Sequence, residues 1–130
     1  MKRMIPVLLM TLALAGCAMP ARQGKANGYI SIPMEEAAAR MAQESGYILL
    51  DVRTQEEYDD GHIPGALLLP NETIGFQQSD LLPDKEQLIF VYCRSGNRSK
   101  QAAAKLAQMG YTNIVEIGGI GSWKGEIVVE

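Results

Sequence analysis

The sequence predicts an α/β domain built on a central parallel sheet of five strands, with helices on both faces. Short apolar runs alternate with segments of helical periodicity from about residue 28 onward, as in folds built from strand–helix–strand units. The runs at 47–52 and 88–92 are apolar on both faces, which is typical of parallel strands covered on both sides. The chain has 130 residues, of which 47% are hydrophobic and 21% charged, enough for one domain with a real core.

Each expected element has a local reason. A first helix is expected to begin at Pro33, which suits a first helical position, and to end before Gly46 in the usual C′ role. Thr54 and Glu57 form a capping box for a short second helix through Tyr58. The remaining elements are strands at 29–32, 47–52, 66–69, 88–92 and 113–117, a helix at 99–109 followed by Gly110, and one helical turn near 77–82.

The segment that carries chemistry begins at Cys93, directly after the apolar run 88–92. A cysteine at the end of a buried strand, followed by a tight polar loop and a helix start, faces the loop amides and the positive end of the helix dipole. Both favour the thiolate, which is the nucleophilic form. We therefore predict that Cys93 is the catalytic residue. The candidate substrate-binding and loop residues are Arg94, Ser95, Gly96, Asn97, Arg98 and Ser99.

The loop residues have different expected roles. Gly96 allows a tight turn at positive φ. Arg94 or Arg98 can pair with an anionic substrate, the alternative being plain surface arginines. Ser95 and Asn97 are expected to act mainly through their backbones.

Asp51 also ends an apolar strand, and sites in parallel sheets form beyond the carboxyl ends of the strands. Asp51 and Cys93 could therefore share a site. We expect Asp51 and Arg53 to form an ion pair that supports the loop rather than to take part in the chemistry. The chain has one histidine, His62, and with Cys17 lipidated one free cysteine, which falls short of a zinc site.

The first residues have the pattern of a secretory signal. Lys2 and Arg3 precede an apolar run at 4–15 that is too short to span a bilayer, which takes roughly 20 residues. The last two residues of this run belong to the segment Leu14-Ala15-Gly16-Cys17, which resembles the lipobox of bacterial lipoproteins.

That resemblance implies a signal peptide at 1–16 and a lipidated Cys17 carrying acyl chains such as palmitate. Residues 17–27 would then be the lipidated N-terminus and a tether, of which the ten residues 18–27 reach at most about 35 Å, and 28–130 the folded domain. Ala18 follows where an Asp would indicate the inner membrane, so the resemblance favours the outer membrane, facing the periplasm. The alternative is cleavage near Ala15 or Ala18, which would give a soluble periplasmic protein. With Cys17 acylated, Cys93 would be a lone thiol in an oxidising compartment, which indicates a thiol kept for reactivity.

Three ordered motifs resemble the rhodanese family over roughly residues 28–130. The first motif comprises 51–54, 56–58 and 61–66, and the second is the Cys93 loop. The third is Gly118-Gly119-Ile120 with Trp123. Gln55, where proline is common, and a C-terminal end without the usual proline depart from the family pattern.

The resemblance implies a rhodanese-like fold and a thiosulfate sulfurtransferase. Thiosulfate, polysulfide or another small sulfane donor would form a persulfide on Cys93, and a thiol, cyanide or a protein acceptor would remove the sulfur. It implies no metal or organic cofactor, places His62 in a structural turn, and makes Trp123 a core residue.

The sequence leaves two alternatives to sulfur transfer, a phosphatase and a persulfide carrier. Cysteine phosphatases of similar fold place the arginine six positions after the cysteine, whereas Arg98 follows Cys93 by five. A persulfide carrier that binds sulfur without turnover is the other. The formal charge of −3 and the lack of a basic patch in the sequence argue against a nucleic-acid partner.

Overall fold

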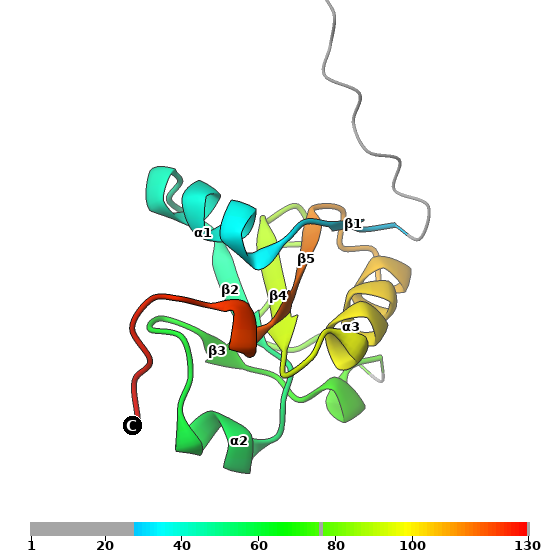
Figure 1. The fold of residues 1–130 in the computed structure, drawn as a ribbon. Coiled ribbons are helices and arrows are strands. Elements are labelled where there is room, and N and C mark those ends of the chain that lie inside the picture. The colour runs from blue at the N-terminus through cyan, green and yellow to red at the C-terminus, as the bar shows by residue number, and fades with distance from the viewer. Residues whose placement is uncertain (1–27, 76, 130) are drawn as a thin grey trace, which may run out of the picture.

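The computed structural model describes residues 28–75 and 77–129. The expectations for the signal peptide, the tether and Cys17 lie outside these residues. The described part confirms the predicted fold class, a five-stranded parallel sheet with helices on both faces (Figure 1). The strands run in the order β1-β5-β4-β2-β3. Their bounds are β1 Ile30–Ser31, β2 Ile48–Asp51, β3 Leu67–Leu68, β4 Ile89–Cys93 and β5 Ile114–Gly119.

Two helices cover opposite faces of the sheet. Helix α1 (Met34–Gln43) buries Met34, Ala37 and Met41 against one face, and α3 (Asn97–Gln108) buries an alanine-rich side against the other. The short helix α2 (Gln55–Asp60) lies at the end of the sheet where β2 and β4 finish (Figure 1). No helix in the described part of the chain is long and apolar enough to cross a membrane.

Strand β4 is the central strand and decides where the cysteine points. All five of its residues are buried, and side chains alternate between the two faces. Phe90 and Tyr92 pack on the α1 face, whereas Val91 and Cys93 pack on the α3 face. The Cys93 side chain therefore points toward the start of α3.

The first helix differs from its prediction at both ends. Pro33 is the N-cap with an extended ψ of 150°, not the first helical residue. The helix ends at Gln43 with Glu44 as an extended C-cap, so Gly46 is not its C′ residue. Gly46 instead takes a φ of 73° in the turn that leads into β2, a conformation that glycine adopts without strain.

Other boundaries also shift. The helical turn expected near 77–82 is wrong: the turn lies at Asn71–Thr73, labelled η1, and Leu82 N–H donates to Ser79 O in a simple turn. Helix α3 begins at Asn97, two residues earlier than expected, because Gly96 completes the turn from β4. The short last turn η2 (Ile120–Ser122) precedes Trp123, which packs against the α1-side core as expected.

Candidate active site

The loop after β4 wraps closely around the sulfur of Cys93. Gly96 takes a φ of 105°, which turns its amide back toward the strand, and α3 starts at the next residue. The Gly96 N–H donates to Cys93 Sγ at 2.9 Å. The thiol lies 3.4 Å from Ser99 Oγ, in the first turn of α3. The described chain thus places loop amides around the sulfur, the arrangement predicted from the sequence.

The environment of Cys93 lowers the pKa of its thiol below the ordinary value. Burial is the largest influence and acts in the opposite direction, since the residue is fully covered. Hydrogen bonding with the Ser99 side chain, together with hydrogen bonds from the amides of Ser99, Gly96 and Ser95, outweighs it. Hydrogen bonds that favour the charged form therefore act against burial and increase the thiolate character of this sulfur.

Behind the sulfur lies a buried carboxylate that the sequence reasoning missed. Glu116, in the middle of β5, is 2% exposed. Its Oε2 accepts from Ser99 Oγ at 2.7 Å and from Gly118 N–H at 2.5 Å, and its Oε1 accepts from Ser31 Oγ at 3.0 Å. One signal could have found it: a lone glutamate between Val115 and Ile117 in an otherwise apolar strand.

The closing glycine motif lets β5 approach the loop. Cys93 pairs with Gly119 in the sheet register. A Cβ built on Gly119 would clash with the carbonyl oxygen of Arg94, a contact that no side chain could make. Gly119 is therefore required for the loop to lie against the sheet.

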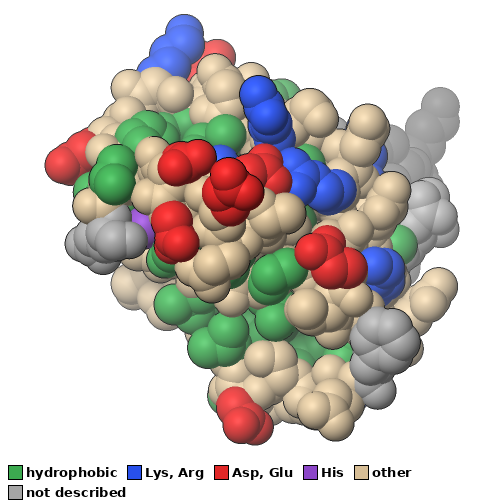
Figure 2. Space-filling view, turned by 90° about the horizontal axis from the view of Figure 1, so that it is seen from below, with side chains coloured by type: hydrophobic (Ala, Val, Ile, Leu, Met, Phe, Trp, Pro, Cys, Tyr) green, Lys and Arg blue, Asp and Glu red, His purple; other side chains and the backbone are tan. Residues whose placement is uncertain are grey.

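The two loop arginines have different surroundings. Arg98 holds Glu57 with two parallel hydrogen bonds, from Nη1 to Oε1 at 2.6 Å and from Nη2 to Oε2 at 2.9 Å. This joins α3 to the capping box of α2, because Glu57 also bonds Thr54. Arg94 is exposed at the loop surface. Seen from the end of the sheet where the strands finish, acidic and basic side chains lie beside one another (Figure 2).

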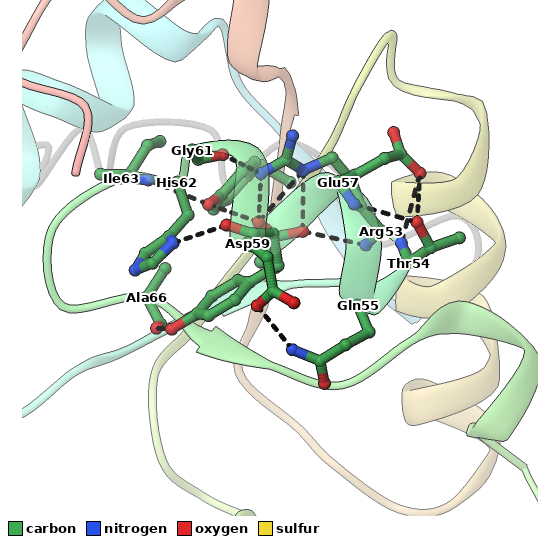
Figure 3. A network of polar contacts seen from close by, with 12 residues as sticks. Arg53, Thr54, Gln55, Glu57, Asp59, Gly61, His62, Ile63 and Ala66 are labelled. Atoms are coloured by element: carbon green, nitrogen blue, oxygen red, sulfur yellow. Dashed lines mark hydrogen bonds and ion pairs between the residues drawn. The ribbon is translucent and has the colours of Figure 1, made fainter. Parts of the chain in front are cut away.

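Asp51 and Arg53 form a buried ion pair on the opposite face of the sheet from the sulfur. Arg53 Nη2 lies 2.7 Å from Asp51 Oδ2 and also donates to Gly61 O at 2.7 Å (Figure 3). Asp51 Oδ2 further accepts from Tyr92 O–H at 2.7 Å. Because Tyr92 and Cys93 point to opposite faces, the structure does not bring Asp51 and the thiol together. The pair instead fixes the end of β2 to the turn that follows α2.

His62 also makes structural contacts, in the turn that follows α2. Its ring stacks on Tyr58 with centroids 3.7 Å apart, and Nδ1 lies 2.8 Å from Tyr58 O. Its backbone pairs with Val128, which closes the C-terminal segment onto the turn. Within residues 28–75 and 77–129, no group of three or more His, Cys, Asp or Glu could hold a metal ion.

Comparison with known proteins places these features in a family. The model of the rhodanese-like domain matches residues 34–126. A sulfurtransferase of Allochromatium vinosum is 40% identical over 93 residues, which is 71% of this chain and 85% of that protein. The thiosulfate sulfurtransferase PspE of Escherichia coli is 37% identical over 71 residues, covering 55% of this chain and 68% of that protein.

Solved structures of rhodanese domains are similar to this chain in fold. A rhodanese with anions from E. coli superposes with a TM-score of 0.60 at 32% identity, covering 65% of this chain and 99% of that chain. The rhodanese-like domain of the Anabaena protein Alr3790 gives a TM-score of 0.68 at 27% identity, covering 77% of this chain and 79% of that one.

Proposed function

This chain belongs to the rhodanese-like domain family, and we propose that it transfers a sulfane sulfur from thiosulfate or a similar donor through a persulfide on Cys93. Its relatives include sulfurtransferases, which supports sulfur transfer in general. The observation that carries the proposed persulfide mechanism is the 2.9 Å hydrogen bond from Gly96 N–H to Cys93 Sγ. It supplies a main-chain donor to a sulfur that must be an anion to react.

The first step is a displacement at sulfur. The Cys93 thiolate attacks the outer sulfur of thiosulfate, a new S–S bond forms, and sulfite leaves with the electron pair of the broken bond. In the second step an acceptor attacks the outer sulfur of the persulfide, and the Cys93 thiolate leaves. With cyanide the product is thiocyanate. The covalent intermediate divides the transfer into two easier steps.

The loop amides serve both anions of this cycle. The outer sulfur of a persulfide is negatively charged, as is the resting thiolate, and preorganised amides stabilise such charge without rearranging. By analogy with oxyanion holes, one such donor contributes about 2.7–4 kcal/mol. The amides of Ser95, Gly96 and Ser99, which already lower the pKa of Cys93, are the groups in place for this.

A dianionic donor needs a cation near the loop. Arg98 is already bonded to Glu57, so Arg94 on the exposed side of the loop is the residue we favour for contact with the donor and its sulfite leaving group. The acceptor side of the reaction can be a thiol, cyanide or a protein.

The central test is the Cys93→Ser variant. We expect it to abolish thiocyanate formation from thiosulfate and cyanide, because a serine hydroxyl does not ionise at neutral pH. Mass spectrometry of the wild-type protein after thiosulfate treatment should show one added sulfur on the Cys93 peptide, and the variant should show none. Substantial turnover in the variant would refute the mechanism.

We also propose that Cys17 carries a lipid that anchors the protein at the bacterial cell envelope, facing the periplasm at the outer membrane. The support is the run Leu14-Ala15-Gly16-Cys17 after a basic start and an apolar stretch. An acidic chain is not drawn to anionic lipid by its charge, and one acyl chain would hold it poorly, so several chains are expected.

The Cys17→Ser variant tests the anchor. We expect turnover to be retained while the protein moves from the membrane fraction to the soluble fraction. Intact-mass measurement of the membrane-bound wild type should show acyl chains on Cys17. Unchanged membrane fractionation of the variant would overturn the lipid assignment and leave the sulfur-transfer proposal untouched.

A further inference from the structure

Glu116 is a buried carboxylate without a cation. Among the residues that the structure describes, no lysine, arginine or histidine lies within ion-pair distance of it. Its partners are neutral donors: the hydroxyls of Ser31 and Ser99 and the amide of Gly118. Burying a carboxylate without an opposite charge beside it is costly. The Ser99 hydroxyl contacts both this carboxylate and Cys93 Sγ.

The Ser99 hydroxyl has one proton and three neighbours that could accept it. Glu116 Oε2 lies at 2.7 Å, Gly96 O at 2.9 Å and Cys93 Sγ at 3.4 Å. Hydrogen bonds to a charged oxygen are shorter and roughly twice as strong as those between neutral groups. The short contact to Glu116 therefore fixes the Ser99 hydroxyl beside the sulfur.

We propose that Glu116 is a positioning residue that fixes the Ser99 hydroxyl beside Cys93 Sγ and sets a negative charge behind the reacting sulfur. The thiolate is then held by the loop amides and opposed by this charge. The inference deepens the proposed function, because it rests on Cys93 being the sulfur that reacts. A thiolate stabilised too strongly is a weaker nucleophile, so the opposing charge keeps the sulfur reactive.

The charges around the sulfur come from three elements. Arg98 on α3 interacts with Cys93 electrostatically, but its guanidinium is held by Glu57. Arg94 on the loop is exposed to solvent, which screens its charge. Glu116 on β5 is buried, so its charge is screened least.

The test is Glu116→Gln in a full-length Cys17→Ser background, where Cys93 is the one thiol. Glutamine can keep every contact: its Oε1 can accept from Ser99 and Gly118, and its amide can donate to the oxygen of Ser31. Only the charge is lost. We measure the pH at which half of Cys93 is ionised from the ultraviolet absorbance of the thiolate, after subtracting a Cys93→Ser control. We expect this midpoint to fall by about one pH unit, the size expected when a like charge nearby is removed.

Two further variants make the test specific. Ser31→Ala removes a partner of Glu116 but leaves its charge, so the midpoint should not move. Ser99→Ala removes the side-chain contact that lowers the pKa of Cys93 but leaves the Glu116 charge, so the midpoint should rise rather than fall. If Glu116→Gln fails to fold, Glu116→Met removes the same charge, and a midpoint that is unchanged or higher in that variant overturns the proposal.

An unchanged or higher midpoint in a folded Glu116→Gln protein would also overturn it. Thiolate absorbance does not require sulfur transfer. A failure here is therefore distinguishable from a failure of the proposed reaction, which the Cys93→Ser turnover assay reports separately.

Discussion

Two buried carboxylates lie on the strands that flank the central strand, and they have different kinds of partner. Asp51 ends β2 and Glu116 lies in β5, and the two residues are 0% and 2% exposed. Asp51 meets the guanidinium of Arg53 at 2.7 Å. Glu116 meets only hydroxyl and amide donors among the described residues. The same burial is thus offset by a full opposite charge in one case and by neutral dipoles in the other.

The difference in partners corresponds to the face of the sheet on which each carboxylate lies. Asp51 and Tyr92 lie on the α1 face, where the ion pair holds the end of β2 and the turn at Gly61 in place. Glu116 bonds Ser99 on the α3 face, next to Cys93. A neutralised carboxylate can only support the fold, whereas one without a cation also projects its charge onto a neighbouring sulfur. On our proposal for Glu116, the two sites separate structural support from control of the reactivity of Cys93.

The largest expected effect comes from breaking the paired site. Arg53→Met leaves Asp51 as a buried anion with its cation removed, which typically costs about 3–5 kcal/mol of folding free energy. The Arg53 side chain also donates to Gly61 O, so a buried carbonyl loses its partner as well. The measurement is urea unfolding of the purified variant beside the wild type.

The double variant Asp51→Asn with Arg53→Met is the matched control, because it removes the orphaned charge and should recover part of the loss. Glu116→Gln should cost far less than Arg53→Met, since it deletes a charge that no cation stabilised. An Arg53→Met protein as stable as the wild type would contradict the comparison.

Much of the fold and the centre of the site could be predicted because their causes are local. Cys93 is followed within three residues by Gly96 and then by a helix start, so the strand–loop–helix order fixes where the amides point. Thr54 and Glu57 are three residues apart and form the capping box that the sequence indicated. The alternation of apolar runs and helical segments gave the parallel sheet in the same way.

What the sequence did not reveal depends on contacts between distant segments. Glu116 reaches Ser99 across 17 residues, and Arg98 reaches Glu57 across 41, so neither pair leaves a local pattern. The expectation that Asp51 could share a site with Cys93 used the edge of the sheet but not its two faces. Pleating decides the face: Asp51 is in register with Tyr92, and the next residue along β4 points the other way.

The smallest expected effect comes from the partly exposed ion pair of Arg98 and Glu57, which joins α3 to α2. The Arg98 guanidinium bonded to Glu57 lowers the pKa of that carboxyl from 4.5 to about 2. Ionised Glu57 therefore contributes stability that is fully present above about pH 4.5 and is lost as the pH falls toward about 2. Both side chains are partly exposed, so solvent screening limits the contribution to about 1 kcal/mol. Glu57→Gln should remove this amount at neutral pH while keeping a side chain that can still complete the capping box with Thr54.

The shape of the pH dependence identifies the cause. The difference in unfolding free energy between Glu57→Gln and the wild type should shrink as the pH falls through the acid range, because protonation removes the same charge from the wild type. Glu56→Gln, an exposed neighbour in the same helical turn, controls for the general loss of one acidic charge and should show no such trend. A difference that stays constant with pH would mean that Glu57 acts through packing and capping alone, and that α2 and α3 are not joined by charge.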